Sequence, residues 1–158
     1  MAPAGSSDPG LLILGSLPGE ASLRAQQYYA HPQNQFWRLV GASIGEGLAD
    51  LDYPRRLERL AARGIALWDV VGTALREGSL DGAIRNALAN PLCEFVAGHF
   101  RLQAIAFNGQ TAARLGRLAL AGVEGPLLID LPSSSPAYTL PFAWKAERWA
   151  ELGRFASR

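Results

Sequence analysis

The sequence is poor in the residues that hold metal ions. It contains one cysteine, Cys93, and two histidines, His31 and His99. A structural zinc or iron-sulfur site needs about four such ligands close together, and these three residues form no cluster of that size. We therefore expect neither a metal ion nor another cofactor.

Long apolar runs and a strong charge of one sign are also missing. No run approaches the ~20 residues of a transmembrane helix, and residues 1–10 lack the basic and then apolar pattern of a signal peptide. We expect a cytoplasmic protein that binds no membrane, with a flexible N-terminus over residues 1–10. The formal net charge of +1 neither favours nor excludes nucleic acid, because binding depends on a local basic surface.

The hydrophobic pattern predicts one domain over residues 11–158. Hydrophobic residues make up 49% of the chain and charged residues 18%, the balance of a soluble globular protein. Four apolar runs are typical of strands buried on both faces: 11–14, 65–68, 104–107 and 127–131. Segments with helical spacing alternate with them: 36–44, 57–64, 84–96 with a break near Pro91, 111–120 and 142–155. The alternation predicts an α/β fold, a three-layer αβα arrangement around a central, mainly parallel four-stranded sheet.

Ligands of such sheets bind beyond the carboxyl ends of the strands. The loop after the first predicted strand is Gly15-Ser16-Leu17-Pro18-Gly19. Its glycines and proline fix a tight turn that can bring backbone N–H groups close to a ligand. An ordinary turn explains the same residues equally well.

The most specific stretch runs from Tyr28 to Trp37 and reads YYAHPQNQFW. A flat ring such as that of Tyr29 can stack on an extruded base, and Asn34 can donate one hydrogen bond while accepting another. The alternative makes Asn34 the start of a helix and places Tyr28, Phe36 and Trp37 in the core. For Phe36 and Trp37 we expect the core.

Two polar residues follow other predicted strands. Asp69 follows the second predicted strand, where its carboxylate could contact the edge of a bound base. A carboxylate there would accept from the N1–H of hypoxanthine and repel the N1 lone pair of adenine, although Asp69 can equally cap a backbone turn. The segment from Arg76 to Asp81 continues this loop. Asn108 would point into the same crevice, and a structural role in the turn with Gly109 is the alternative that we favour for it.

The last loop, from Leu131 to Thr139, reads LPSSSPAYT. Its three hydroxyls and its backbone amides, held by two prolines, suit DNA phosphates, although a plain solvated loop has the same composition. The only lysine, Lys145, lies in the predicted terminal helix. We expect it to lie away from the strand ends, where it offers no amine for a Schiff base.

Three segments together resemble the ordered motifs of the uracil-DNA glycosylase superfamily: 15–19, 29–37 and 131–136. The segment 67–72 with 76–81 resembles the hypoxanthine-DNA glycosylases in particular. One departure is Ser16, which stands where most of the superfamily carries a water-activating asparagine or aspartate. The resemblance implies that catalysis relies on Asn34, with Ser16 at the usual catalytic position.

The resemblance also implies the roles of the remaining residues. The base would be bound by Gly15, Leu17, Tyr29, His31, Asp69 and Asn108. DNA would be held by Ser133, Ser134, Ser135, Pro136, Ala137 and Tyr138, the last two near the gap that a flipped nucleotide leaves.

The function expected from this resemblance is that of a monomeric, monofunctional DNA glycosylase. It would flip a deaminated base, hypoxanthine, out of double-stranded DNA and hydrolyse its glycosidic bond. A mismatch-type uracil-DNA glycosylase is the alternative within the class, and an inactive lesion-binding protein is the alternative outside it. A small-molecule hydrolase using His31 with Ser133, Ser134 or Ser135 ranks third, because no Gly-x-Ser-x-Gly elbow follows a strand.

Overall fold

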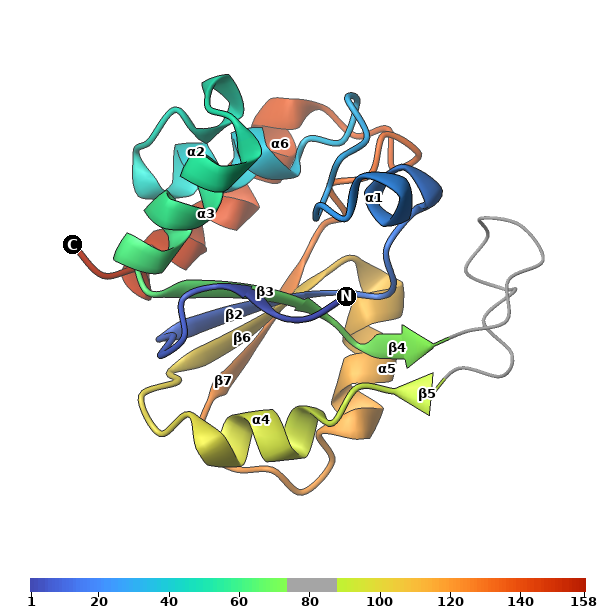
Figure 1. The fold of residues 1–158 in the computed structure, drawn as a ribbon, viewed down its shortest axis with the longest axis vertical. Coiled ribbons are helices and arrows are strands. Elements are labelled where there is room, and N and C mark those ends of the chain that lie inside the picture. Colours follow the sequence, from blue (N-terminus) through green and yellow to red (C-terminus); the bar gives the residue numbers. More distant parts are fainter. Residues whose placement is uncertain (74–87) are drawn as a thin grey trace.

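A five-stranded sheet forms the centre of the protein, in a computed structural model that describes residues 1–73 and 88–158 (Figure 1). Its strands are β1 (Ala4–Gly5), β2 (Leu11–Gly15), β3 (Ile65–Asp69), β6 (Ala104–Asn108) and β7 (Leu127–Leu131), in the spatial order β1-β3-β2-β6-β7. All pairs are parallel except β1 with β3. The prediction of a mainly parallel sheet is confirmed, and the four predicted runs coincide with the four parallel strands.

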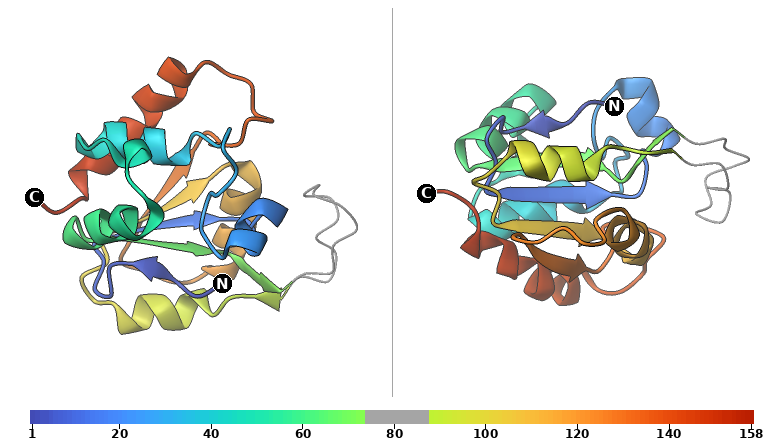
Figure 2. Two further views of the ribbon diagram at one scale, coloured as in Figure 1. Left: turned by 45° about the horizontal axis from the view of Figure 1, so that its top comes forward. Right: turned by 90° about the horizontal axis from the view of Figure 1, so that it is seen from below.

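Helices cover both faces of the sheet, as the alternating pattern predicted. The helices α2 (Phe36–Ile44), α3 (Tyr53–Ala62) and α6 (Phe142–Trp149) lie on one face, and α4 (Leu92–Gly98) and α5 (Gln110–Ala119) lie on the other (Figures 1 and 2). Every residue of β2 and β3 is buried, which explains their unbroken hydrophobicity. The prediction of burial on both faces is wrong for β7, because β7 lies at the edge of the sheet and its Leu127 and Asp130 are exposed. The arrangement has three layers, αβα.

Local signals fix the ends of several helices. The side chain of Asp52 caps α3 by accepting from the Arg55 N–H at 3.1 Å, and a proline occupies its first turn. Gly45 ends α2 at a φ of 71°, a left-handed conformation that glycine adopts without steric cost. The described residues also form α1 (Glu20–Ala25) and the short 3₁₀ helices η1 (Leu48–Asp50) and η3 (Ala150–Arg154), the last continuing α6.

Part of the predicted third helix is a strand. Leu88–Ala89 form β5, which pairs with β4 (Val71–Thr73), and α4 begins only after Pro91. Proline lacks the N–H that a helix interior needs, so the helix begins after Pro91 and the residues before Pro91 pair as a strand. The segment from Arg76 to Asp81 and the start of the predicted helix lie outside the described residues.

The first ten residues carry the edge strand β1, which the hydrophobic pattern did not predict. Ala4 and Gly5 pair with Leu67 and Ala66. Beyond the strand, the indole N–H of Trp68 donates to the Met1 carbonyl at 3.1 Å. These contacts place part of residues 1–10 against the sheet.

The strand order defines where a ligand can bind. The chain runs from β2 to β3 on one side and then crosses to β6 on the other side of β2. The crevice at such a switch point lies beyond the carboxyl ends of the strands. No helix in residues 1–73 and 88–158 is long and apolar enough to cross a membrane.

Candidate active site

The carboxyl ends of the parallel strands bring the predicted polar residues to one edge of the sheet. Gly15 pairs with Asp69 across β2 and β3, and Asn108 pairs with Leu131 across β6 and β7. The loops after β2 and β7 begin at this edge (Figure 1), and the segment before α2 joins the last loop there, because the Gln35 N–H donates to the Ser134 carbonyl at 3.0 Å. The parallel register is therefore what assembles the site.

A chain of side-chain hydrogen bonds connects three of these loops. The Asn108 amide N–H donates to the Ser134 hydroxyl at 2.8 Å, and that hydroxyl donates to Asn34 Oδ1, also at 2.8 Å. The backbone N–H of Ser134 donates to Asn108 Oδ1 at 2.9 Å. Ser134 is only 1% exposed, so water cannot compete for these bonds. We call Asn108, Ser134 and Asn34 the relay.

Two backbone N–H groups fix the direction of the relay. A backbone N–H can only donate, so Asn108 must present its oxygen to Ser134 N. At the other end, the Phe36 N–H donates to Asn34 Oδ1 at 3.0 Å. The oxygen of Asn34 therefore accepts two hydrogen bonds, from Phe36 and from Ser134. Its side-chain nitrogen, Nδ2, forms no hydrogen bond with the described residues and is left as a donor for a ligand.

Asp69, Tyr29 and Gly15 form the second cluster of the site. Asp69 is 5% exposed, and a Cβ placed on Gly15 would lie 2.6 Å from its Oδ1 and 3.0 Å from the Tyr29 hydroxyl oxygen. No residue with a side chain fits at position 15 without moving one of them. Burial raises the pKa of Tyr29 well above its ordinary value, and the charge of Asp69 raises it further. The Tyr29 hydroxyl therefore stays protonated at neutral pH.

The backbone of Tyr29 is strained. Its φ is 55°, a left-handed value that is uncommon for a bulky side chain and costs about 1–2 kcal/mol. The ring stacks on Phe36 with centroids 3.8 Å apart and planes at 12°. Phe36 and Trp37 are both buried in the core, as predicted. Tyr29 is half-buried, so core packing supports one face of its ring.

The other predicted base contacts surround these clusters. Ser16 and Leu17 are half-buried at the end of β2, where the Ser16 carbonyl accepts from the Val71 N–H at 2.9 Å. His31 is exposed, and its Nδ1 accepts from the Gln33 N–H at 3.1 Å. Each belongs to a loop at the same edge of the sheet.

The three serines of the last loop differ in their surroundings. Ser133 and Ser135 are half-buried, and each hydroxyl oxygen accepts from a backbone N–H two residues later, at 3.1 and 3.2 Å. Such oxygens keep their O–H hydrogens for another acceptor. Pro136, Ala137 and Tyr138 are exposed. Ser134 is buried in the relay and has no surface for a phosphate.

The expectation for Lys145 is wrong, because its ammonium reaches two of the site loops. The Nζ atom donates to Gln35 Oε1 at 3.0 Å and to the Ser135 carbonyl at 3.3 Å. Lys145 is 1% exposed. A signal was present in the sequence: Lys145 precedes the buried Trp149 by four positions, which places both on one face of the helix.

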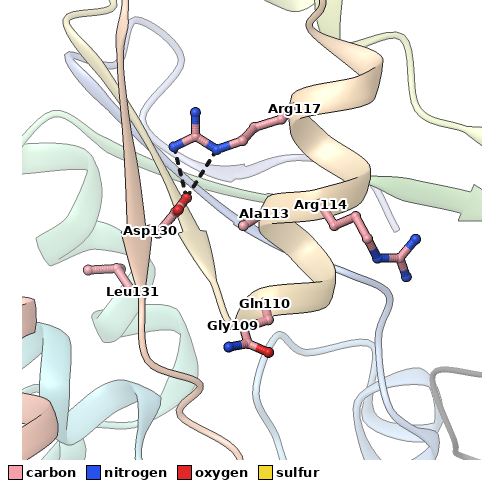
Figure 3. Close-up of a pocket in the computed structure, with 7 residues that line it drawn as sticks. All are labelled: Gly109, Gln110, Ala113, Arg114, Arg117, Asp130 and Leu131. Carbon is pink, nitrogen blue, oxygen red and sulfur yellow. Dashed lines mark hydrogen bonds and ion pairs between the residues drawn. The ribbon is translucent and has the colours of Figure 1, made fainter.

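A hollow of about 280 Å³ adjoins this edge of the sheet without including the relay. In Figure 3, Arg117 reaches from α5 to Asp130 on β7, while Arg114 extends away from that ion pair. The end of the hollow near the last loop is lined by Gly109 and Leu131. Among residues 1–73 and 88–158, no three His, Cys, Asp or Glu side chains are grouped closely enough to hold a metal ion.

Known proteins match this chain over most of its length. The family model of the uracil DNA glycosylase superfamily matches residues 2–153. A protein of Methanosarcina barkeri named hypoxanthine DNA glycosylase is 39% identical over 142 residues, 89% of this chain and 88% of its own. A protein of Methanosarcina acetivorans with the same name is 44% identical over 127 residues, 80% of this chain and 79% of its own.

A solved structure has the same fold. It is the solution NMR structure of a Methanosarcina acetivorans protein with a provisional uracil DNA glycosylase name. The TM-score is 0.86 at 38% sequence identity, and the match covers 97% of this chain and 94% of that one.

Proposed function

The chain belongs to the uracil-DNA glycosylase superfamily and is a DNA N-glycosylase, and on that premise we propose that it excises hypoxanthine from deoxyinosine in double-stranded DNA. Two relatives that carry the name hypoxanthine DNA glycosylase support this substrate. The observation that carries the proposal is the relay, which holds Asn34 with its amide nitrogen free to donate. We infer that the protein acts as a monomer.

Asn34 acts on the leaving base. Cleavage of the C1'–N bond develops positive charge on the sugar and negative charge on the base, and fixed donors aimed at the developing anion lower the barrier. With its oxygen held by Phe36 and Ser134, Asn34 donates from Nδ2 to an acceptor atom of hypoxanthine. One donor of this kind contributes about 10²–10³ in rate. Ser16 carries no carboxylate or amide, so Asn34 takes the main catalytic role.

Tyr29 and Asp69 recognise the flipped base. The ring of Tyr29, supported from behind by Phe36, offers its other face for stacking. The Asp69 carboxylate lies beside Tyr29 at the floor of the site, where it accepts from the N1–H of hypoxanthine. Adenine presents a lone pair at N1 and is repelled. Because Gly15 has no side chain, the Asp69 carboxylate and the Tyr29 hydroxyl can lie against its backbone.

The last loop holds the DNA while the base is out of the duplex. Ser133 and Ser135 donate their free hydroxyl hydrogens to phosphates, and Ala137 and Tyr138 occupy the gap left by the nucleotide. Flipping costs a few kcal/mol, and less from a mismatched pair. Inosine opposite thymine is therefore a good substrate.

The reaction is monofunctional. A strand-cleaving glycosylase attacks the sugar with an amine, and the only lysine side chain is buried and committed to Gln35 and Ser135. Water is then the nucleophile, and an abasic site is the product. Borohydride trapping of a covalent protein–DNA adduct would overturn this assignment.

Base release from oligonucleotides tests the substrate. Duplexes with a single deoxyinosine or deoxyuridine opposite each normal base are incubated with the protein, and hot alkali reveals abasic sites. We expect release of hypoxanthine to exceed release of uracil. Preferential release of uracil from G:U pairs would move the chain to the mismatch uracil group, and tight binding without any release would indicate a lesion-binding protein.

A further inference from the structure

Lys145 is a buried cation with no anionic partner in the described part of the chain. None of the ion pairs within residues 1–73 and 88–158 includes it. Its partners are the neutral oxygens of Gln35 and Ser135. Burial lowers the pKa of Lys145 below its ordinary value, because an ammonium loses hydration in the interior. An uncompensated buried charge lowers the free energy of unfolding, so the stability of the fold does not explain why a lysine occupies this position.

The contacts of Lys145 tie together two segments that carry the chemistry. Gln35 follows Asn34 directly, and its backbone N–H donates to the Ser134 carbonyl at 3.0 Å. Its side chain accepts from Lys145, which also donates to the Ser135 carbonyl. The three residues thus bridge the last loop and the segment before α2. Without Lys145, the two segments would be joined by the backbone hydrogen bond from Gln35 to Ser134 and by the relay bond itself.

Lys145 also supports the exposed tip of the last loop. Its Nζ lies 5.3 Å from the centroid of the Tyr138 ring, within the range of a cation–π contact. Tyr138 is 39% exposed. The positive charge therefore lies directly beneath the surface that is proposed to face DNA.

We propose that Lys145 is a positioning residue for DNA, holding the last loop against the Asn34 segment and giving that loop the positive charge that a DNA phosphate meets. This inference rests on the proposed function, because it takes the last loop as the DNA-binding surface. A phosphate at the loop supplies the counterion that Lys145 lacks in the free protein. In the low-dielectric interior, this attraction is stronger than that of an exposed lysine.

Two variants separate the charge from the bridge. Lys145→Met removes the charge and the donor while keeping an unbranched side chain of similar length. Gln35→Met removes the side-chain acceptor of Lys145 and leaves the charge in place. Binding is measured on a duplex with one tetrahydrofuran abasic analogue, between about 50 and 200 mM salt. This probe carries no target base, so the result does not depend on which base the enzyme removes.

We expect Lys145→Met to bind the probe about tenfold or more weakly, with a shallower salt dependence. Its thermal stability should stay close to that of the wild type, because removal of the uncompensated charge offsets the loss of the two hydrogen bonds. Gln35→Met should keep the wild-type salt dependence and lower the single-turnover rate of base release. A purely structural lysine would leave the salt dependence unchanged.

The outcomes are distinct from those that test the substrate. Equal salt dependence for Lys145→Met and the wild type would overturn the role of Lys145, whatever base the enzyme prefers. A wild type that binds the probe but releases uracil would correct the substrate and leave the role of Lys145 standing.

Discussion

Replacing each serine of the last loop by alanine separates a relay residue from phosphate-binding residues. The Ser134 hydroxyl makes two hydrogen bonds, with Asn108 and with Asn34. At about 1 kcal/mol each, their loss costs about 2 kcal/mol of unfolding free energy. In a domain of this size that lowers Tm by about 4–8 °C.

The kinetic effect of Ser134→Ala follows from what Asn34 retains. Its oxygen still accepts from the Phe36 N–H, so the amide is loosened but not lost. The rate of base release should fall by about 10- to 100-fold, less than the ~10²–10³ expected for losing the donor itself. DNA affinity should stay close to that of the wild type, because the hydroxyl is buried.

Ser133→Ala and Ser135→Ala are the matched controls. Each loses one local hydrogen bond to a backbone N–H and one proposed phosphate contact. We expect them to weaken DNA binding and to leave the rate at saturating enzyme unchanged. Single-turnover base release and titration with an uncleavable duplex measure the two effects. The reasoning is refuted if the three variants show the same rate.

Three further substitutions test other parts of the account. Gly15→Ala places a Cβ 2.6 Å from Asp69 Oδ1, so it should cost about 1–3 kcal/mol of stability and abolish most activity, whereas Gly19→Ala, with open space around its Cβ, should leave both unchanged. Asp69→Asn should reduce the kcat/KM for deoxyinosine about tenfold or more and reduce the ratio of this kcat/KM to that for deoxyadenosine; an unchanged ratio would show that Asp69 does not accept from the N1–H of the base. The pKa of Glu46 is held below its ordinary 4.5 by hydrogen bonds from Arg59 and Arg63. The ion pairs of Glu46 therefore stabilise the fold above pH 4.5, and this stabilisation is lost as pH falls through the lowered pKa. The Tm of Glu46→Gln should equal that of the wild type in acid and be lower than it near pH 7. A Tm difference that is the same at every pH would contradict this role of Glu46.

Most strands and helices could be predicted because a buried strand requires consecutive apolar residues and a helix packed on a sheet requires apolar residues at helical spacing. β2, β3 and β6 show nearly continuous apolar runs, β7 is apolar except at Asp130, and α2, α3, α5 and α6 each have an apolar face. β1 and β5 could not be predicted, because each has two residues and depends on pairing with a distant strand. The helical spacing over 142–155 covers both α6 and the 3₁₀ helix that continues it, but the spacing does not tell the two kinds of helix apart.

The site could be located from the loops, but its contacts could not. The residues of the relay follow or precede predicted elements, so their common edge was expected. That Ser134 alone of three adjacent serines bonds to Asn34 depends on the direction in which each side chain leaves the loop. The bridge of Lys145 to Gln35 joins residues separated by 110 positions, and no local pattern reports such a contact.

The central claim is that Asn34 works as a hydrogen-bond donor to the leaving hypoxanthine, and Asn34→Asp tests it most directly. The carboxylate keeps an oxygen for Phe36 and Ser134 but places a second, negative oxygen where the donor stood. Single-turnover release of hypoxanthine from a duplex with one deoxyinosine opposite thymine is compared for the wild type and the variant. The account predicts a folded variant slowed by at least ~10²-fold. A variant that releases hypoxanthine as fast as the wild type would show that Asn34 acts as an acceptor for water, and would contradict the claim.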